Sequence, residues 1–258
     1  MGSLRWTRDQ VKLAFHLYCQ LPFGKLHSRN PEIIRLASLI GRTPSAVAMK
    51  LVNLASLDPS ITETGRKGLG NASDVDREVW NEFHTDWERV AVECAATLAQ
   101  YAEEQESAVS PDDEVPLSDY TGETRAVISQ QRVRQNFFRR AVLASYNGRC
   151  CMSGLADSRL LVASHIVPWK SDKTNRLNPS NGLCLSALHD KAFDRGLISL
   201  SDHYEIHVSE AIKRANDPFL AKVLIPIEGT RIQLPERFYP SKAFIEHHRQ
   251  NVFIDNCQ

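Results

Sequence analysis

The chain has 258 residues, 42% of them hydrophobic, and its 31 basic side chains balance 31 acidic ones. This balance excludes a simple polycation, the apolar content is sufficient for folded cores, and the length favours two domains. There is no secretory signal and no apolar run near the roughly 20 residues that span a bilayer, so we expect a cytoplasmic protein without membrane contact.

Three helices are predicted within the first 55 residues. Each begins at a side chain that suits an N-cap, and in two cases proline follows at the first helical position. These starts are Thr7, Asn30-Pro31 and Thr43-Pro44. Apolar residues then recur at helical spacing, and Gly41 is predicted to end the second helix.

The second and third helices resemble a helix-turn-helix unit, and the opening Trp6-Thr7 resembles Myb-like three-helix domains. Small Ala37 lies four residues before Gly41 and apolar Val47 six after it, as helix-turn-helix packing requires. The resemblance implies that the start of the third helix contacts duplex DNA. The residues implied are Arg42, Thr43, Ser45, Ala46, Met49 and Lys50. A helical bundle without a DNA role is the alternative.

Aromatic residues at helical spacing follow in the next predicted helix. Trp80, Phe83, Trp87 and Val90 fall on one face, which predicts a buried core. An aromatic cage for a modified base is the alternative interpretation.

A solvated acidic linker is predicted between residues 102 and 124. This segment has eight acidic residues and no basic one, and it contains Pro111 and Pro116. We therefore expect a helical DNA-recognition domain at residues 1–101 and a second domain at residues 125–258.

A basic helix is predicted to open the second domain. Residues 125–149 contain six arginines and no acidic residue, beside an apolar face. This pattern predicts contacts to the phosphate backbone of DNA, with a solvated charged face as the alternative. The predicted contacts are Arg132, Arg134, Arg139 and Arg140.

A strand, a second short strand and a helix are predicted from "LLVASHIVPW", "NGLCLS" and "ALHDKAFDRG". His165 lies near the end of the first strand, Asn181 sixteen residues later, and His189 24 residues after His165. A β-β-α arrangement brings the two histidines and the amide together at one end of the hairpin.

These segments, together with "YNGRCCMSGL", resemble the HNH endonuclease family, whose fold is the ββα-metal unit. The resemblance is to a zinc-free branch with the motifs "SHIxPW", "NGL" and "LHxxxFDxG", and it covers about Arg132 to Glu210. The implied fold class is α+β, with an α-helical, helix-turn-helix-like N-terminal domain and a C-terminal ββα-metal nuclease domain.

The resemblance implies roles for three residues. Neutral His165 would be the general base that activates water, a task that suits its ordinary pKa near 6.5. His189 would bind one divalent cation, Mg²⁺ or Mn²⁺, and Asn181 would brace the loop after the first strand. Hydrolysis would leave 5′-phosphate ends.

The chain departs from the family pattern at two positions. Ser164 stands where many members have an acidic residue or histidine as a metal ligand, and Phe193 where some have histidine. A hydroxyl is a weak ligand, so we expect Ser164 to contribute little and metal affinity without DNA to be low. Lys170 and Arg176, in the following loop, are expected to contact phosphates, with solvated loop charges as the alternative.

No structural zinc is expected, because the six cysteines lack paired Cys-x-x-Cys spacing. We expect them to be reduced thiols. In the closing helix, His247 and His248 are expected at the surface.

The sequence therefore predicts a metal-dependent DNA endonuclease with a restriction or phage-defence role, with dependence on a base modification left open. Because one HNH site cuts one strand, cleavage of double-stranded DNA favours a homodimer. The alternatives are a DNA-binding regulator with an inactive HNH unit and a non-specific or RNA-cutting nuclease.

Overall fold

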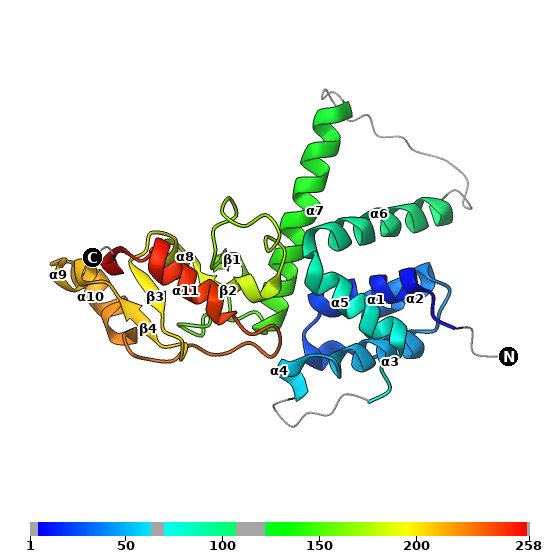
Figure 1. Ribbon diagram of the computed structural model, residues 1–258, viewed down its shortest axis with the longest axis horizontal. Coiled ribbons are helices and arrows are strands. Elements are labelled where there is room, and N and C mark those ends of the chain that lie inside the picture. Colours follow the sequence, from blue (N-terminus) through cyan, green and yellow to red (C-terminus); the bar gives the residue numbers. More distant parts are fainter. Residues whose placement is uncertain (1–4, 63–69, 107–121, 257–258) are drawn as a thin grey trace. The chain divides into compact units, whose positions relative to one another are not determined.

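The structure is a computed structural model that describes residues 5–62, 70–106 and 122–256. It divides the chain into two compact units, Met1–Arg140 and Ala141–Gln258, and each is considered by itself (Figure 1). In the described residues no helix is long and apolar enough to cross a membrane.

The division differs from the boundary predicted at the acidic segment. It falls inside helix α7 (Gly122–Ser145), after Arg140. The preceding part of α7 belongs to the first unit because Phe137 stacks on His16 and Arg140 pairs with Glu32. Helix α6 (Trp87–Glu106) continues into the predicted linker, and residues 107–121 lie outside the described residues.

The first unit is helical. Its remaining elements are α1 (Arg8–Gln20), η1 (Phe23–Lys25), α2 (Pro31–Leu39), α3 (Pro44–Ala55), α4 (Pro59–Thr62) and α5 (Asp74–Thr85).

The three predicted helix starts are confirmed. The Thr7 hydroxyl accepts the Gln10 amide at 3.2 Å, Asn30 accepts from Glu32, and Thr43 accepts from Ala46. Each bond satisfies a backbone N–H that the first helical turn leaves without a partner. Gly41 follows α2 with φ +64°, a conformation that glycine adopts without strain.

The aromatic residues predicted at helical spacing are core, but they lie on two helices and not one: Trp80 and Phe83 on α5, Trp87 on α6. Phe83 and Trp87 are fully buried, and Phe15 of α1 packs on Phe83 with ring centroids 4.5 Å apart. Trp80 packs edge-on against the same Phe15 ring at 5.2 Å. The structure therefore supports the core interpretation over an open aromatic cage.

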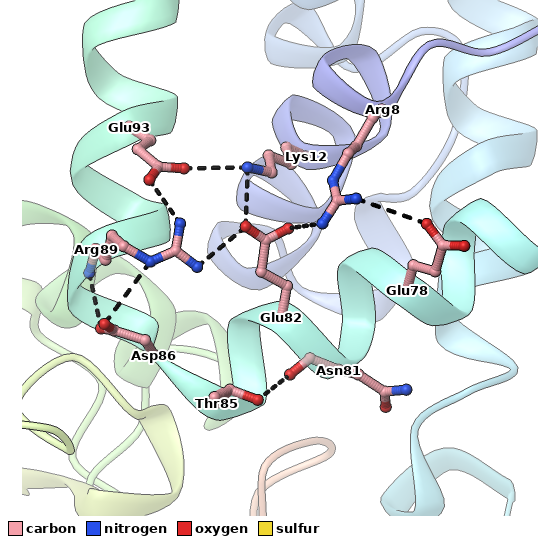
Figure 2. A network of polar contacts seen from close by, with 9 residues as sticks. All are labelled: Arg8, Lys12, Glu78, Asn81, Glu82, Thr85, Asp86, Arg89 and Glu93. Carbon is pink, nitrogen blue, oxygen red and sulfur yellow. Dashed lines mark hydrogen bonds and ion pairs between the residues drawn. The ribbon is translucent and has the colours of Figure 1, made fainter.

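A network of charged side chains ties α1 to α5 and α6 (Figure 2). Glu82 accepts from Arg8 at 2.9 Å and pairs with Lys12 and Arg89 at 3.0 Å each, and both Lys12 and Arg89 also pair with Glu93. Burial raises the pKa of Glu82, but these cations lower it more, to about 2. The carboxylate is therefore ionised at neutral pH and joins three helices.

The second unit has two small antiparallel sheets among helices, which fits the predicted α+β class. Strands β1 (Leu161–His165) and β2 (Gly182–Ser186) pair with His165 opposite Gly182, and α8 (Ala187–Asp194) follows directly. The predicted β-β-α order is thus confirmed. The other elements are η2 (Ser158–Leu160), η3 (Pro179–Asn181), β3 (Ile198–Leu200), β4 (Ile206–Val208), α9 (Glu210–Arg214), α10 (Pro218–Val223), η4 (Ile225–Ile227), α11 (Lys242–Asn251) and η5 (Ile254–Asn256).

Glycine is required where α8 ends. Gly196 has φ +66°, and a Cβ there would lie 2.0 Å from the Val252 carbonyl oxygen. The close approach lets the chain after α11 pack against the end of α8, where the Ile254 amide donates to the Gly196 carbonyl.

The expectation that His248 lies at the surface is wrong. It is 2% exposed and stacks on Phe193 of α8 with ring centroids 3.7 Å apart. Its Nε2 donates to the Phe193 carbonyl at 3.1 Å, and its Nδ1 accepts from the Ser199 hydroxyl at 2.9 Å. His248 therefore joins α11 to α8 and β3.

Candidate active site

His165 is held as a neutral ring with a defined tautomer. Its Nε2 lies 2.9 Å from the Arg176 carbonyl oxygen, which only accepts, so Nε2 carries the proton and Nδ1 the lone pair. Burial lowers the pKa of His165, and the bond to Arg176 and the charge of Asp190 oppose this effect. The ring is therefore unprotonated at neutral pH, as a general base must be.

Asn181 joins the two ends of the loop that follows β1. Its side-chain oxygen accepts the Val167 amide at 2.8 Å, and its side-chain nitrogen donates to the carbonyls of Val167 and Asn175 at 3.3 and 3.2 Å. Its own carbonyl accepts from Ile166 at 2.9 Å. Asn181 is 1% exposed and fixes the backbone that directly follows His165 at the end of β1.

The loop supplies the carbonyl that orients His165. Asp172 accepts hydrogen bonds from Thr174 and Asn175, which shapes the turn before Arg176. Burial raises the pKa of Asp172, but these bonds lower it more, so the carboxylate stays charged. Sequence reasoning missed Asp172, although Asp followed by Thr and Asn is typical of an Asx turn.

Arg176 is engaged within the loop, and Lys170 is exposed in it. The Arg176 Nε donates to the Trp169 carbonyl at 2.7 Å, and the guanidinium lies over the Trp169 ring at 5.1 Å. The Trp169 ring in turn meets His165 edge-on at 5.4 Å. Sequence reasoning considered only the charge of Arg176 and missed the contact of its carbonyl with His165.

His189 has one nitrogen with partners and one without. The residue is 3% exposed, and its Nδ1 lies 2.7 Å from the Ser186 hydroxyl and 3.8 Å from the Cys150 sulfur. Its Nε2 is buried and has no hydrogen-bond partner among the described residues. The Ser164 hydroxyl is likewise buried without a hydrogen-bond partner there. These are the two side chains that the sequence assigned to the metal.

The donor set fits a divalent cation for which the protein supplies only some of the ligands. Buried polar atoms without partners call for an explanation, and an absent ion is one. The residues that the structure describes contain no group of three or more His, Cys, Asp or Glu that could hold a metal ion. A cation at Ser164 and His189 would therefore complete its shell with water and substrate oxygens, as Mg²⁺ commonly does.

Phe193 is part of the core beneath α8. It is 1% exposed and stacks on His248, so this position contributes packing where some relatives of the motif have a histidine. The nearby Asp194 has its pKa raised by burial and by the charge of Asp190.

Cys150 contacts the site from the segment before β1. Burial raises the pKa of its thiol, but hydrogen bonds from His189, Ser153 and the Met152 backbone lower it more, to about 6. Spacing gave no indication of this contact, because Cys150 and His189 are 39 residues apart in sequence.

Most of the predicted DNA contacts in α3 remain accessible. Ser45 and Thr43 are exposed, Met49 is 58% exposed, and Ala46 is partly exposed. Arg42 donates to the Arg5 carbonyl at 2.7 Å and to Gln10, which leaves it half-buried.

The expectation that Lys50 is exposed is wrong. Lys50 is 6% exposed, and its ammonium donates to both carboxylate oxygens of Asp76 at 2.8 and 3.0 Å. Asp76 is fully buried and also accepts the Ser73 amide that begins α5. Lys50 is on the face of α3 that packs against α5, so it is not available to a phosphate.

At least two of the four predicted arginine contacts in α7 pair with acids of the first unit. Arg134 pairs with Glu88 at 3.2 Å, and Arg140 pairs with Glu32. Arg132 and Arg139 are exposed. The interpretation of α7 as a uniform basic face therefore holds for part of the helix only.

Comparison with known families gives one match to this second unit. Residues 150–201, about a fifth of the chain, match the model of the HNH endonuclease family. The matched segment contains His165, Asn181 and His189, and it supports metal-dependent nuclease activity at the level of the family. The comparison with curated proteins gives no match.

Proposed function

From the HNH endonuclease domain at residues 150–201, we propose that this chain is a metal-dependent endonuclease that hydrolyses DNA. The observation that carries the proposal is the state of His165. Its ring is neutral, its proton is fixed on Nε2 by the Arg176 carbonyl, and Nδ1 therefore has the lone pair that a general base needs.

In the proposed reaction His165 Nδ1 takes a proton from a water molecule as its oxygen attacks the phosphorus. The bond from water oxygen to phosphorus forms and the bond to the 3′-oxygen breaks. The leaving 3′-oxygen takes a proton from solvent water, so the products are a 5′-phosphate and a 3′-hydroxyl. The imidazolium that forms donates from Nε2 to the Arg176 backbone carbonyl, and the negative charge of Asp190 favours it. Asn181 keeps the ring in place through its bonds to the loop.

A bound Mg²⁺ or Mn²⁺ would neutralise the phosphate and stabilise the leaving oxygen. His189 Nε2 and Ser164 Oγ would hold it, since both atoms are buried without hydrogen-bond partners in the described chain. Two protein ligands give weak affinity without substrate, so no zinc-like site is proposed.

The substrate we propose is double-stranded DNA, bound by the first unit through the exposed start of α3. Ser45, Thr43 and Met49 are the proposed contacts there, and the turn at Gly41 supports the helix-turn-helix interpretation. Arg132 and Arg139 are the proposed backbone contacts of α7. A restriction or phage-defence role, a preference for modified bases and a homodimer that cuts both strands remain proposals by analogy.

Plasmid cleavage tests the catalytic assignment. With Mg²⁺ or Mn²⁺ the chain is expected to nick supercoiled DNA, and His165→Ala is expected to lose about 100-fold or more of the rate while still binding DNA. His203→Ala, in an exposed turn of the same unit, is the matched control and should cut normally. Equal cleavage by His165→Ala and the unchanged chain would contradict the assignment.

The departures at Ser164 and Phe193 favour one second candidate, a DNA-binding regulator with an inactive HNH unit. It predicts that the unchanged chain binds duplex DNA and cuts neither DNA nor RNA with any divalent metal. Parallel assays on modified DNA, unmodified DNA and RNA separate this candidate, and an RNA-cutting nuclease, from the proposal.

The salt dependence of binding tests the arginine contacts. Arg132→Glu with Arg139→Glu is expected to weaken duplex binding and to reduce the slope of log affinity against log salt by about 2. Lys213→Glu with Arg214→Glu, a charge-matched pair on α9 for which no DNA contact is predicted, is the control. An unchanged slope would remove α7 from the proposed interface.

A further inference from the structure

We propose that Ser186 is a positioning residue that selects the tautomer of His189, so that the proton lies on Nδ1 and the lone pair on Nε2. The assignment of His189 to a metal rests on the proposed function, whereas the tautomer itself is a property of the protein alone.

One hydroxyl oxygen holds both the backbone and the ring of His189. Ser186 is the N-cap of α8, and its Oγ accepts the His189 backbone amide at 3.3 Å. The same oxygen lies 2.7 Å from Nδ1 of the His189 ring. Because both contacts converge on one residue, the cap fixes the ring as well as the first turn of the helix.

The surroundings of the two ring nitrogens decide where the proton lies. A neutral imidazole has one N–H and one lone pair. Near Nδ1 lie two groups that can accept its proton or donate their own, the Ser186 hydroxyl and, more weakly, the Cys150 thiol. Around Nε2 there is no hydrogen-bond partner within the part of the chain that the structure describes.

A proton on Nδ1 therefore makes a hydrogen bond, and a proton on Nε2 does not. The alternative has the Ser186 hydroxyl donate to Nδ1, but it leaves a buried N–H without a partner. Orphaned buried N–H groups are rarer than unpaired acceptors. The Ser186 oxygen has two lone pairs, so it accepts from both the backbone amide and the ring.

This tautomer prepares Nε2 for a cation before one arrives. A metal-bound histidine donates its other N–H to a neighbour, which fixes both tautomer and ring orientation. In this chain Ser186, the N-cap of α8, provides that neighbour. The cost of moving a proton on binding is avoided, which matters at a site with few protein ligands.

The tautomer is measured by long-range ¹H–¹⁵N correlation spectra of the full chain labelled with ¹⁵N-histidine, in the absence of metal. His189→Gln identifies the His189 resonances. We expect the unprotonated ring nitrogen to be Nε2, recognised by its coupling to both ring carbon-bound protons. If the unprotonated nitrogen is Nδ1 in the unchanged chain, the proposal is wrong.

Variants separate the effect on the ring from the effect on the helix. Ser186→Ala removes both contacts and is expected to return His189 to the common Nε2-protonated form, whereas Ser186→Thr keeps the hydroxyl and the native tautomer. Ser209→Ala removes the matching N-cap of α9 and should leave the His189 spectrum unchanged. A native tautomer in folded Ser186→Ala would overturn the role of Ser186.

Titration with Mn²⁺ then connects the tautomer to binding. Ser186→Ala is expected to bind Mn²⁺ about tenfold more weakly than the unchanged chain, and Ser209→Ala equally well. If the tautomer is as proposed but the unchanged chain neither binds Mn²⁺ nor cuts DNA, the proposed function fails and the inference stands. If DNA is cut and His189 is protonated on Nε2, the inference fails alone.

Discussion

The charged pairs of the first unit and the candidate site of the second differ in whether their polar groups have partners. In the first unit Lys50 pairs with Asp76, and Glu82 is surrounded by Arg8, Lys12 and Arg89. In the second unit Ser164 Oγ and His189 Nε2 are buried with no hydrogen-bond partner in the described chain. A buried polar group normally finds a partner, so the paired groups point to structure. An unpaired group calls for an explanation, which the proposed cation supplies for Ser164 and His189.

The difference matters because the same residue type can be fully paired at one position and partly unpaired at another. His248 and His189 are both buried histidines of the second unit, and both contact a serine hydroxyl. Among the described residues, His248 has partners on both ring nitrogens and His189 on one. Residue type and burial alone therefore do not separate these two histidines, whereas the number of ring nitrogens with partners in the described chain does.

The largest effect on stability is expected from breaking the buried pair of the first unit. Lys50→Met leaves the carboxylate of Asp76 buried without its cation, which is expected to lower the free energy of unfolding by about 3–5 kcal/mol. Chemical denaturation measures the change. Lys50→Met combined with Asp76→Asn should recover a large part of the loss, because no unpaired charge remains.

A small change in the free energy of unfolding of Lys50→Met would contradict the contrast between the paired groups of the first unit and the unpaired groups of the second. It would mean that Asp76 gains access to water or another cation, and that Lys50 is free to act elsewhere. Lys25→Met serves as the control, since Lys25 is exposed at the surface of the same unit.

The next effect is expected from His248 and depends on pH. Burial lowers the pKa of His248 to about 4, below its ordinary 6.5, although the bond to Phe193 opposes the shift. Because the unfolded chain takes up a proton that the folded chain does not, stability is full above pH 6.5 and is lost as the pH falls toward 4. The loss attributable to this group is about 3 kcal/mol.

The measurement is the difference in unfolding free energy between the unchanged chain and His248→Gln across this pH range. The difference is expected to shrink as the pH falls, and this readout excludes the contribution of buried His16, which titrates in both proteins. His189→Gln sharpens the comparison, because removing a ring with one satisfied nitrogen should cost less stability than removing one with two. A larger loss in His189→Gln would contradict it.

The sequence predicted most of the local structure of this chain. Helix starts at Thr7, Asn30 and Thr43 follow from capping chemistry that acts over three residues. The β-β-α order and the positions of His165, Asn181 and His189 follow from the strand pattern and the resemblance of their motifs.

Contacts between distant residues were not predictable in the same way. Lys50 was assigned to the exposed face of α3, but its partner Asp76 is 26 residues away, on another helix. His248 was assigned to the surface, but β3 and α8 cover it. In both cases tertiary packing determines burial, and helical periodicity alone does not identify which face is covered.

The smallest effect is expected in the charge network of Figure 2. Glu82→Gln removes the charge that Arg8, Lys12 and Arg89 share, and the side chain is 13% exposed, so water screens part of the interaction. We expect a loss of about 1 kcal/mol at neutral pH, because partly exposed pairs contribute little individually and networks somewhat more.

The pKa of Glu82, about 2 in the folded chain and about 4.5 ordinarily, sets the pH dependence. Its contribution is complete above pH 4.5 and is lost as the pH falls toward 2, so Glu82→Gln and the unchanged chain should converge in stability there. Thermal unfolding at pH 7 and pH 3 measures this convergence, with Glu78→Gln as the more exposed control on α5. A loss that does not diminish in acid would show that Glu82 acts through packing, and the network would then not belong among the charge pairs that stabilise the first unit.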